Sequence, residues 1–256
     1  MESSSTSSSN TNFSSSPYTL TNVEAINLGK SSHGISTGIG FFDHMLDQFN
    51  SHAQIGVSVH VVVSKQKDGT GSNADTATVT ACNDGGSIHD HAHKNRFANP
   101  PELQEVLMGQ VGEALGLEIR ALLRNSSSSH SRFCCPLDEA LVECTLVNNN
   151  NNNNNIHNNT DEKDNGNLQI FTLPPYGNFP PKTGRTRIGQ MITNPNVRTF
   201  FHHLSQSAGL NVELKKIRGI NGHHVVESAF KAFSRALRNL IDGTDTTTTT
   251  TASNSN

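Results

Sequence analysis

Apolar residues alternate with other residues in three stretches of the chain, as they do in strands that bury one face. From Ile55 to Val63 every second residue is Ile or Val, and Leu141–Val147 and Leu210–Ile217 follow the same pattern. Elsewhere apolar residues recur every three or four positions, which is typical of amphipathic helices. Helices are therefore predicted over residues 41–49, 101–124, 197–208 and 230–241.

The two halves of the chain share one order of elements: a strand, a histidine-containing turn and an amphipathic helix. In the first half His89–His93 precede a helix that carries Glu102, and in the second half His223 and His224 lead into a helix that carries Glu227. This order predicts an α+β protein built from two duplicated βα half-domains, with one metal-binding turn in each copy.

Three low-complexity stretches interrupt this pattern, at residues 1–17, 148–167 and 244–256. They consist almost entirely of Ser, Asn, Thr and charged residues, which cannot bury enough apolar surface to offset the loss of chain entropy. We interpret them as a disordered Ser-rich tail, an Asn-rich surface insertion and a disordered Thr-rich tail. Residues 18–243 are then a single domain that the insertion interrupts.

Charge and cysteine content limit the classes of partner and the compartment. A formal net charge of −3 excludes a broad basic face for nucleic acid. No apolar run approaches the ~18 residues of a membrane-spanning helix, so no membrane partner is expected. Four cysteines without a CxxC pair favour a reduced intracellular compartment. We expect a cytoplasmic protein, with a plastid location as the alternative because the first residues are rich in Ser.

Histidine is the unusual component of the composition, with 13 His beside two Tyr and no Trp. The sharpest cluster is His223-His224-x-x-Glu227, which follows Asn221-Gly222. On a helix Glu227 lies over both imidazoles one turn further on, which makes a half-site for a divalent metal ion. The alternative interpretation is a capped helix start with exposed histidines and an ion-paired glutamate.

Two further segments carry histidines at regular spacing. In an extended His89–His93 segment the alternating histidines face one side, and Asp90 can orient one of the rings. In the helix predicted from residue 41, His44, Gln48 and His52 share one face. A site with several imidazoles and no thiolate suits Mn, Fe, Zn or Ni.

Three long motifs in this sequence resemble the imidazoleglycerol-phosphate dehydratase family, a lyase family of histidine biosynthesis. They are Ser36–Gln48 (STGIGFFDHMLDQ), Pro136–Leu141 (PLDEAL) and Asn221–Ala232 (NGHHVVESAFKA). The resemblance covers roughly Val23–Val147 and Thr183–Ile241. It implies two sheets with helices packed between them, in the ribosomal-protein-S5-domain-2-like fold, and a homo-oligomer of 24 subunits.

The resemblance also implies a function: the metal-dependent dehydration of imidazoleglycerol phosphate to imidazole acetol phosphate in L-histidine biosynthesis, with two Mn²⁺ ions per active site. The implied metal ligands are His44, His91, His93, Glu102, His223, His224 and Glu227. The implied substrate-binding residues are Gln48, His52, Arg132 and Lys231. The implied catalytic acid–base residues are Glu24 and His52.

The sequence departs from the family pattern at two places that concern the metal ligands. Extra residues within 94–101 separate His93 from the following helix, so Glu102 is assigned as the carboxylate of the first motif, with Glu105 as the alternative. Thr199 stands where the family often has a histidine. These departures leave two other functions open: a degenerate, non-catalytic homologue with a structural or regulatory role, and a binuclear-metal hydrolase of a phosphorylated small molecule.

Overall fold

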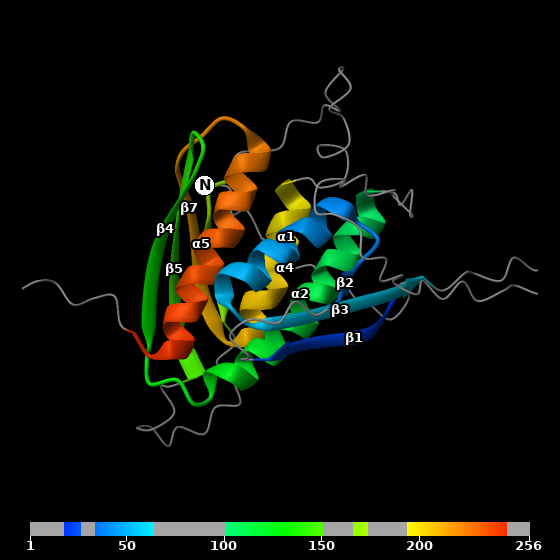
Figure 1. Cartoon of the computed structure of the whole chain (residues 1–256), viewed down its shortest axis with the longest axis horizontal. Helices are drawn as coiled ribbons and strands as arrows, with labels where there is room; N and C mark the ends of the chain where they lie inside the picture. Colours follow the sequence, from blue (N-terminus) through cyan, green and yellow to red (C-terminus); the bar gives the residue numbers. More distant parts are fainter. Residues whose placement is uncertain (1–17, 27–33, 64–100, 151–165, 174–193, 245–256) are drawn as a thin grey trace, which may run out of the picture.

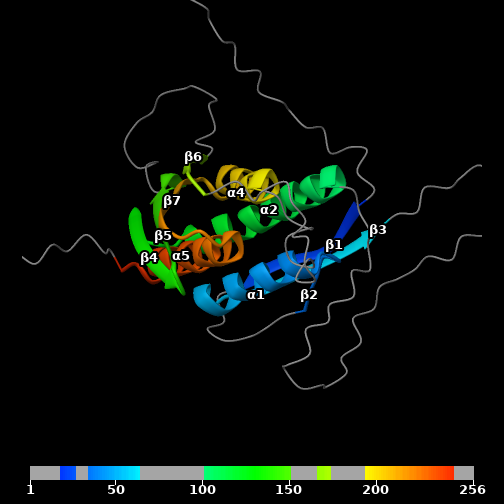
Figure 2. The same ribbon diagram turned by 90° about the horizontal axis from the view of Figure 1, so that it is seen from above.

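The computed structural model describes residues 18–26, 34–63, 101–150, 166–173 and 194–244. In this part of the chain two sheets enclose a layer of helices (Figures 1 and 2). The α+β fold with helices between two sheets, which the sequence predicted, is therefore confirmed. In the described part, no helix is both long and apolar enough to cross a bilayer. The predicted His89–His93 turn and the tails at 1–17 and 245–256 lie outside the described residues.

Among the described residues, each half of the chain supplies one sheet and two helices. The first half contains β1 (Tyr18–Ile26), β2 (Ile35–Ser36), α1 (Gly40–Ala53), β3 (Gly56–Val63) and α2 (Pro101–Leu123). The second half contains β4 (His130–Leu137), β5 (Ala140–Asn148), β6 (Asn167–Phe171), α4 (Asn194–Ala208), β7 (Leu210–Arg218) and α5 (Gly222–Asp242). The three predicted strands and four predicted helices are all present, whereas β1, β2, β4 and β6 lack the alternation that would have predicted them.

The strand pairing shows the duplication directly. In the first sheet β3 lies between an antiparallel β1 and a parallel β2. In the second sheet β7 lies in the same way between an antiparallel β5 and a parallel β6, and β4 is added at the edge beside β5. The equivalent elements of the two halves are therefore β1 and β5, β2 and β6, α1 and α4, β3 and β7, and α2 and α5.

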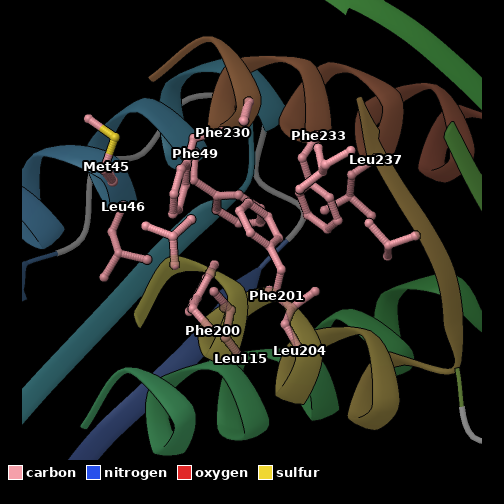
Figure 3. Close-up of a cluster of buried hydrophobic side chains, with 14 of the residues drawn as sticks. Met45, Leu46, Phe49, Leu115, Phe200, Phe201, Leu204, Phe230, Phe233 and Leu237 are labelled. Carbon is pink, nitrogen blue, oxygen red and sulfur yellow. The ribbon is translucent and has the colours of Figure 1, made fainter. Parts of the chain in front are cut away.

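The helices pack in two pairs, α1 with α5 and α2 with α4. The core between them is rich in phenylalanine (Figure 3). Phe200 of α4 contacts Phe42 of α1 and Phe230 of α5, with ring centroids 5.3 and 5.4 Å apart. Phe49 of α1 stacks on Phe233 of α5 at 5.7 Å. These fully buried rings fix the position of α1 relative to α5, which matters for the site described below.

Helices α2 and α4 approach each other closely because glycines face the contact. A Cβ atom at Gly112 would lie 2.5 Å from the carbonyl oxygen of Phe200, and one at Gly116 would lie 2.6 Å from that of Leu204. Real Cβ atoms essentially never come so close to a carbonyl oxygen, and a backbone atom cannot move aside as a flexible side chain can. Only glycine fits these two positions at this spacing of the helices.

The Asn-rich segment is ordered at both ends. Strand β5 runs through Asn148, which is buried, and β6 begins at Asn167. The side chain of Asn150 donates a hydrogen bond to the carbonyl oxygen of Ala208, at 3.0 Å, and so satisfies a free carbonyl at the end of α4. The predicted insertion thus contributes residues 148–150 and 166–167 to the domain, and residues 151–165 lie outside the described part of the chain.

We predict that Gly112→Ala destabilises the protein. Alanine favours a helix over glycine by ~1 kcal/mol, but overpacking a close contact typically costs ~1–3 kcal/mol, and here the clash is with backbone. The thermal unfolding midpoint should therefore fall, at equal protein concentration. Glu113→Ala, at an exposed position of the same helix, is the matched control and should leave the midpoint nearly unchanged. A Gly112→Ala protein as stable as wild type would show that α2 and α4 can separate at no cost.

Candidate metal centre

The start of α5 places His223 and Glu227 one turn apart. The side chain of Asn221 accepts a hydrogen bond from the backbone N–H of His223, at 3.0 Å, and so caps the helix at its first turn. Since the helix then runs without interruption, Nε2 of His223 lies 3.1 Å from Oε2 of Glu227. The spacing predicted from the sequence is thus present as a direct contact.

Helix α1 adds a second imidazole to this pair. His44 of α1 directs its Nε2 to within 3.7 Å of the same carboxylate oxygen, Oε2 of Glu227. Its ring lies nearly parallel to that of His223, with the centroids 6.1 Å apart and an angle of 12° between the planes. One ligand atom from each of the three residues lies within 4.8 Å of the others. We call this group the His44–His223–Glu227 cluster.

The two oxygens of Glu227 have different partners. Oε2 faces the two imidazoles, whereas Oε1 lies 2.8 Å from Nζ of Lys231, one helical turn further on. Burial raises the pKa of Glu227, but hydrogen bonds from His223 and His44 and the contact with Lys231 outweigh it and hold the pKa well below its usual range. Glu227 is therefore a buried anion at neutral pH.

The cluster fits a divalent metal ion. Such ions hold nitrogen and oxygen ligands at about 2.0–2.2 Å, so donor atoms up to about 4.3 Å apart can share one ion, and small side-chain rotations bring the widest pair of the cluster into this range. Two imidazoles and a carboxylate suit Mn, Fe, Zn or Ni. Nδ1 of His223, the ring nitrogen on the side away from Glu227, is buried without a hydrogen-bond partner among the described residues.

His224 turns away from the cluster although it neighbours His223. Its Nδ1 lies 2.7 Å from Oε2 of Glu139, in the turn between β4 and β5, and its Nε2 lies 3.4 Å from Oδ2 of Asp138. Glu139 also accepts a hydrogen bond from the backbone N–H of Asn221, at 2.9 Å. The two adjacent histidines therefore have different partners, and the His44–His223–Glu227 cluster contains His223 but not His224.

His52 lies close to the cluster in the last turn of α1. Its Nδ1 donates a hydrogen bond to the backbone oxygen of Gln48, at 3.0 Å, which leaves the lone pair on Nε2. Burial lowers the pKa of His52, and the nearby charges of Lys231 and Arg235 lower it further. His52 is thus a neutral imidazole that can accept a proton, and its implied roles in substrate binding and acid–base chemistry remain predictions.

Two other predicted residues lie on strands. Arg132 is on β4, where its guanidinium forms an ion pair with Glu143 of β5. Glu24 is on β1, in the other sheet, with an exposed side chain. Their predicted roles in phosphate binding and acid–base chemistry remain predictions.

The first metal motif is described only in part. His91 and His93 lie outside the described residues, and Glu102 lies in the first turn of α2, where side chains are not described. The alternative carboxylate, Glu105, is half-buried and accepts a hydrogen bond from Oγ1 of Thr199 on α4, at 2.7 Å.

Sequence reasoning gave no role to Asp138 and Glu139, although both belong to the PLDEAL motif. The presence of Asp138 and Glu139 in this motif was the signal in the sequence that could have indicated a role for them. Its place between two strands was not predicted, because β4 lacks an alternating pattern.

Comparison with known proteins matches these elements to one family. The model of the imidazoleglycerol-phosphate dehydratase family matches residues 104–237, just over half of the chain. The dehydratase of Prochlorococcus marinus is 32% identical over 206 residues, which cover 80% of this chain and 73% of the relative. That of Cereibacter sphaeroides is 29% identical over 214 residues, which cover 84% and 80%.

Solved structures agree on the fold. The crystal structure of imidazoleglycerol-phosphate dehydratase from Staphylococcus aureus has a TM-score of 0.53 at 19% identity, and covers 87% of this chain and 96% of its own. The structure from Pyrococcus furiosus has a TM-score of 0.54 at 17% identity, and covers 87% and 88%. At these identities the likeness concerns the fold alone.

We predict that Glu139→Gln reduces stability at neutral pH and that the loss disappears in acid. Hydrogen bonds from His224 and from the backbone of Asn221 lower the pKa of Glu139 from 4.5 to about 2. A carboxylate with a lowered pKa stabilises the fold above its unfolded-state pKa, and this contribution is lost as the pH falls through the folded-state value. The difference in unfolding midpoint between wild type and Glu139→Gln should therefore narrow from pH 4.5 to about 2. A difference that does not change with pH would contradict the ionised hydrogen bond.

Proposed function

Because the chain belongs to the imidazoleglycerol-phosphate dehydratase family, we propose that His44, His223 and Glu227 hold a divalent metal ion, preferably Mn²⁺, for the dehydration of imidazoleglycerol phosphate. Family membership makes the chain a hydro-lyase of histidine biosynthesis. The observation that carries the proposal of a metal is the convergence of three donor groups on one point. His44 comes from the first family motif, and His223 and Glu227 come from the third.

Electrostatics favours a metal ion over a simple ion pair at this point. Oε2 of Glu227 faces two imidazole nitrogens, which can bind a metal through their lone pairs once they release their protons. Lys231 already occupies Oε1, so the carboxylate offers one oxygen to a metal. The three ligands among the described residues leave coordination positions for the substrate and for other groups, which the 24-subunit assembly implied by the resemblance could supply from another subunit.

The dehydration expels the hydroxyl group on the carbon beside the imidazole ring, which leaves as water, and removes a proton from the next carbon, so that the resulting enol becomes the ketone of the product. A bound divalent ion supplies Lewis-acid stabilisation of the negative charge that the ring acquires. His52 is placed to handle the proton: Gln48 fixes its Nδ1–H, and its lowered pKa leaves Nε2 free to accept a proton at neutral pH. Glu24 is the other acid–base group implied by the resemblance.

Lys231 is proposed to provide positive charge for the substrate phosphate. Its side chain is only 15% exposed, and its Nζ contacts Glu227 at 2.8 Å, so the ammonium group is held at the edge of the metal centre. A phosphate bound there would contact an ammonium group whose position is already fixed. This contact would orient the substrate and take no part in bond making or breaking. Arg132 is the second cation proposed for the phosphate.

We predict that Glu227→Gln lowers both metal content and turnover. Gln keeps the shape and helix propensity of the side chain but removes the negative charge that offsets the metal ion. Metal affinity should fall by at least the roughly 10–100-fold that loss of an outer-sphere partner causes, and turnover should recover in part at high Mn²⁺. Metal content is measured by elemental analysis and turnover by product formation from imidazoleglycerol phosphate.

The matched control for this experiment is Glu113→Gln, at an exposed position of α2, which should change neither quantity. If Glu227→Gln binds Mn²⁺ and turns over like wild type, the cluster is only the start of a capped helix. If wild type binds Mn²⁺ at this cluster but shows no dehydration, the degenerate homologue is the correct interpretation.

We predict that Lys231→Met raises the apparent KM for imidazoleglycerol phosphate while Mn²⁺ stays bound. Methionine keeps most of the apolar stem and removes the charge, so the lost contact is the one with the phosphate. Steady-state kinetics and elemental analysis of the same preparation measure the two effects. Loss of Mn²⁺ with an unchanged KM would instead assign Lys231 to the orientation of Glu227.

A further inference from the structure

The duplication allows the metal centre to be compared with its counterpart in the other half of the chain. Helices α1 and α4 are equivalent, and each is followed by a residue in the left-handed region: Gln54, with φ of 52°, and Gly209, with φ of 68°. Both residues precede the central strand of their sheet by one or two positions. Ten residues before Gln54 is His44 (54 − 10 = 44), and ten residues before Gly209 is Thr199 (209 − 10 = 199).

The partners of these two residues are equivalent as well. His44 of α1 approaches Glu227 of α5, and Thr199 of α4 donates a hydrogen bond to Glu105 of α2. Since α5 and α2 are the last helices of their halves, both contacts join the same pair of equivalent helices. The Thr199–Glu105 hydrogen bond therefore stands where the first part of a metal centre would be expected by symmetry.

At this second position a hydroxyl group stands where the first position has an imidazole, the nitrogen ligand that suits divalent transition metals. Oγ1 of Thr199 and Oε1 of Glu105 are 2.7 Å apart with a proton between them. The carboxylate of Glu105 thus has a hydroxyl donor from α4 in place of an imidazole ligand, across the close helix contact that the glycines of α2 allow.

Nearby histidines do not replace the missing ligand. His202 and His203 follow Thr199 on α4, with their ring centroids 5.5 Å apart. Among the residues that the structure describes, only the His44–His223–Glu227 cluster gathers three donor atoms within 4.8 Å. The donor set of the second half thus differs from that of the first at the position of Thr199.

We propose that the chain retains one tightly held divalent ion, at the His44–His223–Glu227 cluster, and that the Thr199–Glu105 hydrogen bond has replaced the second metal centre. This rests on the metal centre proposed above. It disagrees with the two ions that the family resemblance implies, and the residue responsible is Thr199. His91 and His93 lie outside the described residues, but an ion that they hold with Glu105 would be counted in the test below.

The test is the number of Mn²⁺ ions per chain in the assembled protein, measured by elemental analysis after gel filtration removes unbound metal. We expect one ion in wild type, one in Glu105→Gln and none in Glu227→Gln. Thr199→His restores the imidazole that symmetry demands and should raise the number to two. Thr199→Ser keeps the hydroxyl group, is the matched control, and should stay at one.

Two ions in wild type, falling to one in Glu105→Gln, would overturn the proposal. One ion in a Thr199→His protein that assembles normally would show that Thr199 is not the residue that excludes the metal. If Thr199→His fails to fold, the comparison of wild type with Glu105→Gln still decides. An ion that survives in Glu227→Gln counts against the metal centre proposed above, and so separates that failure from failure of this inference.

Discussion

The packing of α1 against α5 is the contact on which the proposed metal centre depends. His44 and Glu227 are 183 positions apart in the chain (227 − 44 = 183), so no local structure can bring them together. Stacking of Phe49 on Phe233, and the contacts of Phe200 with both helices, hold α1 and α5 at a fixed separation. Because buried aromatic rings pack at the density of an organic crystal, they position the polar groups at the helix starts with little freedom. The apolar core, shown in Figure 3, therefore determines where the polar groups of the site lie.

The sequence predicted what depends on local periodicity and on long motifs. Helical spacing placed Glu227 over His223, and the resemblance of the motifs to the family included His44 among the metal ligands. One feature depends on a tertiary contact and could not be inferred from spacing. It is the direction of His224, which the β4–β5 turn determines through Glu139. The contact of Lys231 with Glu227, by contrast, is an i, i+4 pair within α5, which helical spacing could have predicted.

The choice between Glu102 and Glu105 shows the same limit. Three positions along a helix keep both residues near one face, so helical periodicity alone did not decide between them. The structure places Glu105 against α4, at the position equivalent to Glu227. The two halves thus have similar backbone arrangements, but single positions differ in the donor groups that they present to a metal ion. Glycines at 112 and 116 make the α2–α4 contact close, and a threonine at 199 places a hydroxyl group beside Glu105, whereas α1 and α5 present two imidazoles around a buried carboxylate.

The central claim is that His44, His223 and Glu227 bind one ion together. Diffraction from crystals grown with Mn²⁺, recorded at the manganese absorption edge, tests it most directly, because the anomalous signal locates manganese without any assumption about ligands. We predict an anomalous peak within coordination distance of Nε2 of His44, Nε2 of His223 and Oε2 of Glu227. A map with manganese elsewhere and none at these three atoms would contradict the claim, and the cluster would then be an ion pair that caps a helix.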